Sequence, residues 1–436
     1  MILYSTNNKD LRVSFKEAVF NSLPADRGLY MPLDIPRLDP YFLQTLPQYS
    51  LQDIAFEVAN KLIGDDIPAA DLKALIADAI NFPAPVKPLD SGVAVLELFH
   101  GPSLAFKDFG ARFMSRVMAY FGAQSDKVLD VLVATSGDTG GAVALGFLGV
   151  PGTRVTILYP KGKVSPIQEL QLTTHGRNIR AIEVDGTFDD CQSLVKEAFN
   201  DPVLRERFQL TSANSINISR LIPQTFYYFH AYAQLRAQGM SEVVFSVPSG
   251  NFGNIGAGVL ASKMGLPVHR FIAATNVNDT VPRFLESGEY TPRPSVQTLS
   301  NAMDVGNPSN WVRILDMLGT SAAQDVAQQL EAYTFNDAET QGAIRQIYDS
   351  YGYVACPHTA VAWLALEAYR KNNPGSYAGV FLSTAHPCKF PDAFEPDIQA
   401  RIEVPASVGE LEASQRVVTP MEAAFEKFKA YLLENA

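Results

Sequence analysis

The chain has 436 residues and is 47% hydrophobic, so it is long enough for two or three domains with large cores. Lys and Arg total 35 against 46 Asp and Glu, a formal net charge of −11, which argues against binding to nucleic acids or to anionic membranes. The three cysteines are far apart and form no CxxC pair, so we expect neither a disulfide framework nor a metal site. The N-terminus shows no signal-peptide pattern and no apolar run is long enough to cross a membrane, which predicts a cytoplasmic protein.

The first 90 or so residues are predicted to form a separate N-terminal unit, which ends at the proline-rich segment NFPAPVKPLD. Beyond it, apolar β-branched runs alternate with Gly-rich turns and amphipathic helices, as in VLDVLVATSGDTGGAVALGFLG. Such runs are typical of parallel strands that are covered by helices on both faces. The pattern predicts an α/β fold with ligands at the carboxyl ends of the strands.

One lysine, Lys107, lies between Phe106 and Phe109 in the apolar stretch HGPSLAFKDFGARFM. Burial disfavours an ammonium and lowers its pKa, and a neutral amine is what a carbonyl compound needs to form a Schiff base. The alternative is a structural lysine that reaches solvent beside Asp108.

A small-residue turn, PSGNFGNIGAG, follows the predicted strand EVVFSV and precedes a helix. Free main-chain N–H groups and the positive end of the helix dipole suit a phosphate at such a turn. The turn lacks the lysine and hydroxyl of a nucleotide P-loop, and its GxxGxxG spacing differs from the GxGxxG of dinucleotide sites. A dinucleotide site and a packing turn without a ligand remain alternatives.

The loop ATSGDTGGAVA has the same strand-to-helix setting and offers Thr135, Ser136, Asp138 and Thr139. Hydroxyl and N–H groups at a helix start can hold a carboxylate, although Asp138 would repel one and would suit a hydroxyl or a protonated nitrogen. The alternative is that Ser136, Asp138 or Thr139 only caps the helix.

Further loops add cationic and hydroxyl groups. YPKGKVSP contains Lys161 and Lys163, and NSINISRLIPQ contains Asn217 and Arg220, which makes both loops candidates for a second anion site. The segment FLSTAHPCKF ends a strand with Ser383 and Thr384, and its His386 suits a structural role better than that of a base.

Pyridoxal phosphate would use this set of groups, because it needs a lysine for its aldehyde, an anion cradle for its phosphate and a partner for its pyridine nitrogen. Lys107, the loop at Gly250, and Ser383 or Thr384 supply the three. A hydroxyl partner favours elimination and replacement chemistry over transamination.

Five segments, HGPSLAFKDFGARFM, ATSGDTGGAVA, NSINISRLIPQ, VPSGNFGNIGAG and STAHPCKF, together resemble the bacterial and fungal threonine synthases over nearly the whole chain. The resemblance implies a tryptophan-synthase-β-like architecture (fold type II) of two α/β domains around the cofactor. It divides the chain into an N-terminal unit (1–92), a smaller α/β domain (93–215) and a larger cofactor-binding domain (216–436).

By this resemblance Lys107 binds the pyridoxal phosphate aldehyde and acts as the base, and Thr384 contacts the pyridine nitrogen. The cofactor phosphate is expected on Ser249, Gly250, Asn251, Phe252, Gly253 and Asn254. We expect the substrate at Thr135, Ser136, Asp138, Thr139, Lys161, Lys163, Asn217 and Arg220, with its carboxylate at the loop of Asp138 and its phosphate at the basic residues. The implied reaction converts O-phospho-L-homoserine and water to L-threonine and phosphate, the last step of threonine biosynthesis.

Other functions remain open from the sequence alone. The nearest is a lyase of the same fold that acts on a phosphorylated hydroxy amino acid without making threonine. A dinucleotide-binding module and an inactive scaffold are the alternatives outside this class, and the presence of Lys107 argues against the scaffold. We expect a small-molecule substrate, no nucleic-acid or membrane partner, and a monomer or small homo-oligomer.

Overall fold

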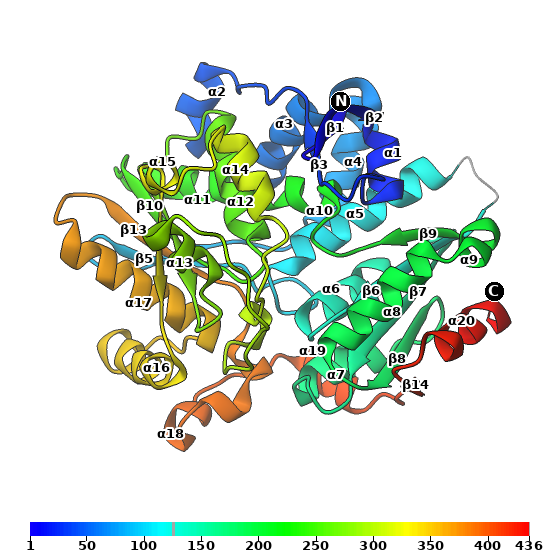
Figure 1. The fold of residues 1–436 in the computed structure, drawn as a ribbon. Coiled ribbons are helices and arrows are strands. Elements are labelled where there is room, and N and C mark those ends of the chain that lie inside the picture. The colour runs from blue at the N-terminus through cyan, green and yellow to red at the C-terminus, as the bar shows by residue number, and fades with distance from the viewer. Residues whose placement is uncertain (124–126, 436) are drawn as a thin grey trace.

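The computed structural model describes residues 1–123 and 127–435, which form three β-sheets with helices packed on and between them (Figure 1). None of the described helices is long and apolar enough to span a membrane. We call the sheets the N-terminal, larger and smaller sheets, and their strands are given below.

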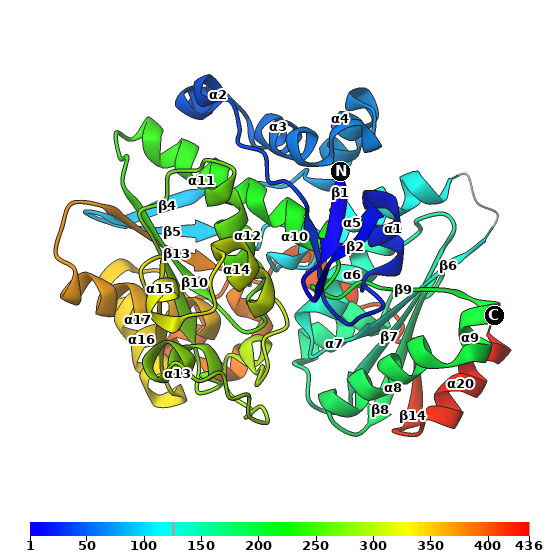
Figure 2. The same ribbon diagram turned by 45° about the horizontal axis from the view of Figure 1, so that its top comes forward.

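The N-terminal sheet is antiparallel, with the strand order β2-β1-β3. Its elements are β1 (Ile2–Ser5), β2 (Asn8–Ser14) and β3 (Tyr30–Pro32), accompanied by α1 (Phe15–Asn21), α2 (Pro40–Thr45), α3 (Leu51–Ile63) and α4 (Ala69–Ala79). Helix α1 begins with a capping box, because the Ser14 hydroxyl accepts from the Glu17 N–H and the Glu17 carboxylate accepts from the Ser14 N–H. Figure 2 shows α3 and α4 lying across the top of the molecule.

The larger sheet has the order β12-β11-β10-β13-β5-β4, and its neighbours are parallel except for the antiparallel pair β5–β4. Its strands are β4 (Val86–Asp90), β5 (Val93–Glu97), β10 (Val243–Pro248), β11 (Arg270–Thr275), β12 (Leu330–Thr334) and β13 (Ala378–Ser383). The helices around it are α11 (Phe226–Ala237), α12 (Gly253–Lys263), α13 (Thr280–Ser287), α14 (Trp311–Leu318), α15 (Ala323–Ala327), α16 (Asp337–Tyr351) and α17 (Pro357–Asn372).

Alternate residues of β10 face different cores. Val243, Phe245 and Val247 pack with the residues of α11 and α12, whereas Val244 packs with those of α17. The strand is buried along its whole length because helices cover both faces of the sheet, which confirms the predicted parallel α/β layering.

The smaller sheet is parallel throughout, with the order β14-β8-β7-β6-β9. Its strands are β6 (Leu129–Ala134), β7 (Thr153–Pro160), β8 (Ile179–Asp185), β9 (Gln209–Ser212) and β14 (Val418–Glu422). Its helices are α5 (Lys107–Gly122), α6 (Asp138–Phe147), α7 (Pro166–Thr173), α8 (Phe188–Asn200), α9 (Pro202–Arg207), α10 (Ile218–Leu221), α19 (Ala406–Glu412) and α20 (Phe425–Glu434). Helix α18 (Pro396–Gln399) packs instead with α16 of the larger half, through Ile398.

Sheet membership crosses the expected domain ranges at both ends. Strand β4 lies within 1–92 and β5 within 93–215, yet both belong to the larger sheet. Strand β14, within 216–436, belongs to the smaller sheet, where Figure 1 shows α20 beside α8. Phe428 and Leu432 of α20 pack on Cys191 and Leu194 of α8, so the C-terminal segment completes the smaller half of the molecule.

Aromatic packing joins the N-terminal unit to the rest. The Phe15 ring of α1 meets Phe121 of α5 edge-on, with 5.9 Å between ring centroids. On the same helix, Phe109 meets Phe82 at 4.9 Å and Tyr227 of α11 at 5.1 Å. Because Phe109 has no exposed surface, truncating it to alanine would cost about 3–5 kcal/mol. Helix α5, which begins with Lys107, is therefore held on several sides.

Candidate active site

Three neighbouring strands of the larger sheet, β10, β13 and β5, end at the same edge. Ser246 of β10 pairs with Phe381 of β13, and Ser383 of β13 pairs with Glu97 of β5. Continuing the first register by three residues brings Ser249 level with Thr384. The loops that carry the predicted phosphate cradle, Thr384 and Lys107 thus leave the sheet side by side.

The loop between β5 and α5 is bound to the segment that follows β13. Leu104 has a left-handed backbone (φ 57°), Ala105 forms an isolated bridge with Ala385, and the Phe106 N–H donates to the Thr384 carbonyl at 2.8 Å. Lys107 comes next, as the first residue of α5. These contacts fix the backbone on both sides of the predicted pyridine contact and the predicted cofactor lysine.

The Lys107 side chain is half-buried, and its ammonium lies 5.8 Å from the centroid of the Phe106 ring. Burial lowers the pKa of Lys107 to about 8; Asp138 opposes this shift, and the cations Arg220 and Lys389 add to it. A substantial share of the amine is therefore neutral at mildly alkaline pH, which suits a nucleophile and a base.

Asp108, which follows Lys107, is buried and accepts a hydrogen bond from the Ser103 N–H at 2.8 Å. Its other carboxylate oxygen, Oδ1, has no partner among the described residues, and burial raises the pKa of Asp108 to about 6. The carboxylate of Asp108 is thus bound by its own loop.

The turn between β10 and α12 has the geometry of an anion cradle. Phe252, at the N-cap position, has a left-handed backbone (φ 60°) and gives α12 no side-chain cap. The first N–H groups of the eleven-residue helix are therefore directed into the site without a capping side chain. Gly250 is required by close packing, because a Cβ there would lie 2.6 Å from Met303 Cα.

Asn251 anchors this turn. Its Nδ2 donates to Ser215 Oγ at 2.7 Å, and its Oδ1 accepts from the N–H and the hydroxyl of Ser309 at 2.6 and 2.8 Å. The Ser249 hydroxyl donates to the Val247 carbonyl at 2.8 Å. The turn is thus held rigid by its own side chains.

In the side-chain amide of Asn254, the oxygen is hydrogen-bonded and the nitrogen is not. Its Oδ1 accepts from the hydroxyls of Tyr227 and Tyr228, both at 2.7 Å, whereas its buried Nδ2 has no partner among the described residues. An orphaned donor at the start of α12 is what a bound anion would satisfy.

Thr384 is 5% exposed, and its hydroxyl makes no hydrogen bond within the described part of the chain. The Ser383 hydroxyl instead lies 3.0 Å from Thr359 Oγ1, which in turn lies 3.2 Å from Cys356 Sγ. Ser383 is engaged inside the protein, so Thr384 is the residue of the pair that remains available to a ligand.

The loop after β6 is shaped by Thr135. Its hydroxyl accepts from the Gly137 and Gly140 N–H groups at 3.0 and 2.9 Å, so Thr135 holds the start of α6, whereas the structural alternative had given that role to Ser136, Asp138 or Thr139. Gly137 has φ 136°, and a Cβ there would meet the Gln168 side chain at 2.4 Å. The Ser136 and Thr139 side chains are half-buried and free of hydrogen bonds within the described residues.

Asp138 is buried and paired with a cation. Its Oδ1 lies 2.6 Å from Lys389 Nζ and accepts from Gln168 Nε2 at 2.9 Å. Although burial raises the pKa of the Asp138 carboxyl, Lys389 and then Lys107 hold it well below its usual range. Of the two partners predicted for Asp138, a hydroxyl or a protonated nitrogen, the pairing with Lys389 is of the second kind.

The residues predicted to bind the substrate phosphate lie in contrasting surroundings. Lys161 and Lys163 are exposed on the turn between β7 and α7, whereas Arg220 is 2% exposed. Arg220 packs against Gly110 of α5, its Nη1 donates to the Ala213 carbonyl, and its Nε has no partner among the described residues. Burial lowers the pKa of Arg220 to about 10, with Asp108 opposing the shift.

Asn217 has a structural role in this fold. Its Nδ2 donates to the Val19 carbonyl and to Ser22 Oγ at 2.8 and 3.0 Å, and its Oδ1 accepts from the N–H and hydroxyl of Ser219. The side chain has no exposed surface and joins α10 to the N-terminal unit. We therefore do not carry Asn217 forward as a substrate contact.

Sequence reasoning missed Lys389 and His358. Lys389 has no exposed surface and donates to the Ser103 carbonyl at 2.9 Å in addition to its pair with Asp138. Burial lowers the pKa of His358 to about 4, and its Nε2 accepts from the Ala302 N–H at 3.1 Å. Lys389 stood in the quoted segment STAHPCKF as a lone cation among apolar residues, the same signal that had identified Lys107.

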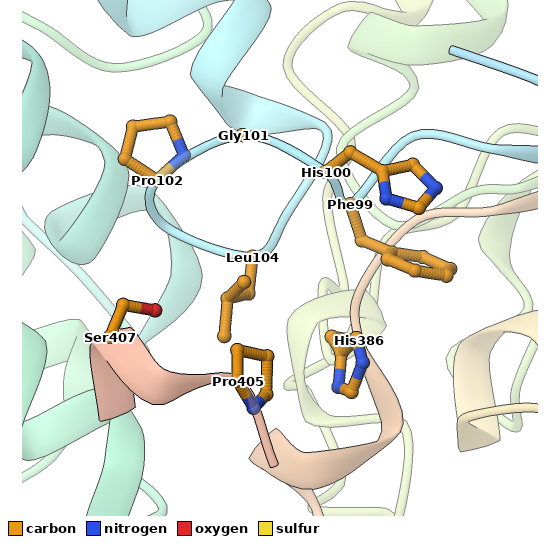
Figure 3. A pocket seen from close by; sticks show the side chains of 8 residues that line it. All are labelled: Phe99, His100, Gly101, Pro102, Leu104, His386, Pro405 and Ser407. Atoms are coloured by element: carbon orange, nitrogen blue, oxygen red, sulfur yellow. The ribbon is translucent and has the colours of Figure 1, made fainter. Parts of the chain in front are cut away.

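A cavity of about 370 Å³ adjoins the Lys107 loop. Figure 3 shows the 99–104 loop on one side, with the Leu104 side chain pointing away from it, and Ser407, Pro405 and His386 on the opposite side. His386 Nδ1 accepts from the Cys388 N–H at 3.2 Å, its ring meets Phe99 edge-on, and burial lowers its pKa to about 4. The structural role predicted for His386 agrees with these contacts.

Comparison with known families covers nearly the whole chain. Residues 82–384 match the family described as pyridoxal-phosphate dependent enzyme. Residues 3–80 match the family described as threonine synthase N terminus, and residues 359–432 the one described as threonine synthase, C-terminal.

Individual relatives agree. The threonine synthase of Escherichia coli (strain K12) is 45% identical over 410 residues, 94% of each chain. The solved structure of threonine synthase from yeast superposes with a TM-score of 0.93 at 34% identity, covering 99% of this chain and 98% of that one. A structure described as PLP-bound threonine synthase from Brucella melitensis gives 0.91 at 35% identity, covering 100% and 99%.

Proposed function

Because this chain belongs to the threonine synthase family of pyridoxal-phosphate-dependent enzymes, we propose that it converts O-phospho-L-homoserine and water to L-threonine and inorganic phosphate. The observation that carries the proposal is the meeting of the Lys107 loop with the Thr384 segment beside the uncapped start of α12. This arrangement presents an amine, a hydroxyl and an anion cradle at one sheet edge.

The residues of the site fit pyridoxal phosphate. The unpartnered Asn254 Nδ2 and the free N–H groups of α12 match a phosphate, and Thr384 carries a hydroxyl without an internal partner among the described residues. We assign the phosphate to the turn from Ser249 to Asn254, the pyridine nitrogen to Thr384 and the aldehyde carbon to Lys107. When bound, the cofactor supplies an electron sink that stabilises negative charge at the substrate Cα.

Lys107 is the group that moves protons in this proposal. Its pKa of about 8 leaves enough neutral amine to accept the proton from the substrate Cα. The reaction also removes a Cβ proton, releases phosphate from Cγ, adds a proton at Cγ and a hydroxide from water at Cβ, and returns a proton to Cα. Phosphate retained in the site can act as acid or base in the late steps, as its second pKa lies near neutrality.

The substrate needs two further anion contacts. We propose that its carboxylate binds the loop of Ser136 and Thr139, where half-buried hydroxyls precede and open α6. Its phosphate is assigned to Arg220, whose buried Nε lacks a partner among the described residues, with Lys161 and Lys163 drawing the anion from solvent. Thr135 and Asp138 support the first contact by shaping the loop and its charge.

Two experiments test the proposal. Borohydride reduction of the cofactor-loaded protein, followed by peptide mapping, should place the pyridoxyl label on Lys107. In the second experiment, a separate unreduced sample of the cofactor-loaded protein is incubated with O-phospho-L-homoserine and should yield threonine and phosphate in equal amounts. A 2-oxo acid in place of threonine would contradict the proposal and support a lyase of the same fold.

Fold type II, the cytoplasmic location and the monomeric or small homo-oligomeric state remain part of the proposal. Sedimentation velocity of the purified protein and imaging of a fluorescent fusion test the last two. A large assembly or a membrane-associated signal would contradict them.

A further inference from the structure

Lys389 has no role in the reaction proposed above. It lies in the 3₁₀ turn Pro387–Lys389 after β13 of the larger sheet, without exposed surface. A fully buried ammonium is costly unless it is paired and hydrogen-bonded. Its partners should therefore show what it does.

Its partners come from both halves of the site. Lys389 Nζ lies 2.6 Å from Asp138 Oδ1, at the start of α6 on the smaller sheet. The same ammonium donates at 2.9 Å to the carbonyl of Ser103, whose N–H donates to Asp108 beside Lys107. One cation thus joins the β13 segment, the Lys107 loop and the loop of Asp138.

Helix α7 completes this arrangement with two amides. Gln168 Nε2 donates to Asp138 Oδ1 at 2.9 Å, and Gln171 Nε2 donates to the Ser103 carbonyl at 3.0 Å. Both oxygens bound by Lys389 are therefore also held by neutral donors. The amides keep the two oxygens in place, but only Lys389 can neutralise Asp138 at this contact.

The charge of Asp138 matters because it acts on Lys107. Charged or titratable groups around the Lys107 amine are Asp138, Arg220, Lys389, His358 and the adjoining Asp108. Asp138 favours the ammonium form of Lys107, whereas Arg220 and Lys389 favour the neutral amine. A carboxylate left without Lys389 would pair with Lys107 and hold it in the form that can neither attack an aldehyde nor accept a proton.

We propose that Lys389 is a positioning residue: by pairing with Asp138 across the two halves of the site, it keeps that carboxylate from pairing with Lys107. The inference rests on the proposed role of Lys107. It also explains how a carboxylate can stand beside the active-site lysine without disabling it.

The test measures the Lys107 amine directly. The full-length protein, freed of cofactor, is mixed with pyridoxal phosphate at a series of pH values, reduced with borohydride and mapped, so that the attachment rate at Lys107 gives its pKa. Lys389→Met should raise this pKa by about one unit, which slows attachment about tenfold below pH 8. Asp138→Asn should shift it in the opposite direction, because Lys389 then acts on Lys107 without its counterion.

Two further variants separate charge from packing. Lys389→Arg keeps the cation and should leave the Lys107 pKa close to that of the unaltered protein. Lys371→Met makes the same change at an exposed lysine of α17 and should leave it unchanged. Thermal unfolding of each variant reports separately on the fold.

The outcomes are distinct. Shifts in the same direction for Lys389→Met and Asp138→Asn, or an equal shift for Lys389→Arg, would overturn the inference, because a purely structural role predicts them. If Lys389→Met does not fold, an unchanged Lys107 pKa in Asp138→Asn would by itself overturn the inference. Failure of the unaltered protein to label at Lys107 would overturn the proposed function instead.

Discussion

The N–H of Phe106 donates to the carbonyl of Thr384 at 2.8 Å, so the residue before the active-site lysine is tied to the proposed pyridine contact. The two residues are far apart in the chain but belong to segments that leave neighbouring strands, β5 and β13. This bond fixes the backbone next to Lys107 against the backbone of Thr384. These are the two residues that would hold the aldehyde carbon and the pyridine nitrogen of the cofactor.

Replacing Lys107 with alanine should abolish covalent cofactor attachment and leave a folded protein. Because the amine is also the proposed base, turnover should fall by at least ~10²-fold. Absorption spectra, circular dichroism and steady-state rates check the three parts. Full turnover in Lys107→Ala would remove Lys107 from the mechanism.

The rate of cofactor attachment should depend on pH through Lys107. Because only the neutral amine attacks and its pKa is about 8, the rate should rise about tenfold per pH unit below pH 8 and level off above it. An ordinary lysine, at 10.5, would still be rising at pH 9. Stopped-flow absorbance of the cofactor-free protein distinguishes the two profiles.

Gly250→Ala tests the phosphate cradle. The added Cβ would lie 2.6 Å from Met303 Cα, which is backbone and has little room to move, so the turn must shift. We expect cofactor affinity to fall at least about tenfold, measured by fluorescence titration. Gly342→Ala, in α16 with nothing within 4 Å of the new Cβ, is the matched control and should leave affinity unchanged. Equal losses in both would place the effect in the fold.

Arg220 and Arg313 are both buried, and we expect different roles for them. Arg220 has an unpartnered Nε beside the Lys107 helix, and we expect Arg220→Ala to raise the apparent KM for O-phospho-L-homoserine about tenfold or more, with a smaller effect on cofactor affinity.

Arg313 is the contrast: its Nε also lacks a partner among the described residues, but its Nη2 donates to the carbonyls of Tyr30 and Ile216 and so joins α14 to the N-terminal unit. Arg313→Ala should lower the melting temperature without a selective change in KM. If Arg220→Ala also behaved in this way, its assignment to the substrate phosphate would be wrong.

The sequence predicted the layered α/β fold and the chemistry of the main loops because both depend on local pattern. Apolar strands with Gly-rich ends indicate parallel sheet, and Lys107 in an apolar run indicates a perturbed amine. The sequence did not predict that β5 belongs to the larger sheet and β14 to the smaller one. Sheet membership depends on contacts between segments far apart in the chain, and the local sequence pattern does not contain that information.

Contacts between side chains that are far apart in the chain could not be predicted from the sequence either. The pair of Asp138 with Lys389 joins residues from different sheets, and the hydrogen bonds of Asn217 to the N-terminal unit turn a predicted ligand contact into a structural one. In both cases the residue type was suggestive, but its role was decided by a neighbour about 200 or more residues away in the chain.

The most direct test of the central claim is the reaction of O-phospho-L-homoserine in ¹⁸O-labelled water, followed by mass spectrometry of both products. The account predicts threonine with one ¹⁸O at its Cβ hydroxyl, together with unlabelled phosphate, because the bond between Cγ and oxygen breaks and water adds at Cβ. Labelled phosphate with homoserine, or a 2-oxo acid without threonine, would contradict it.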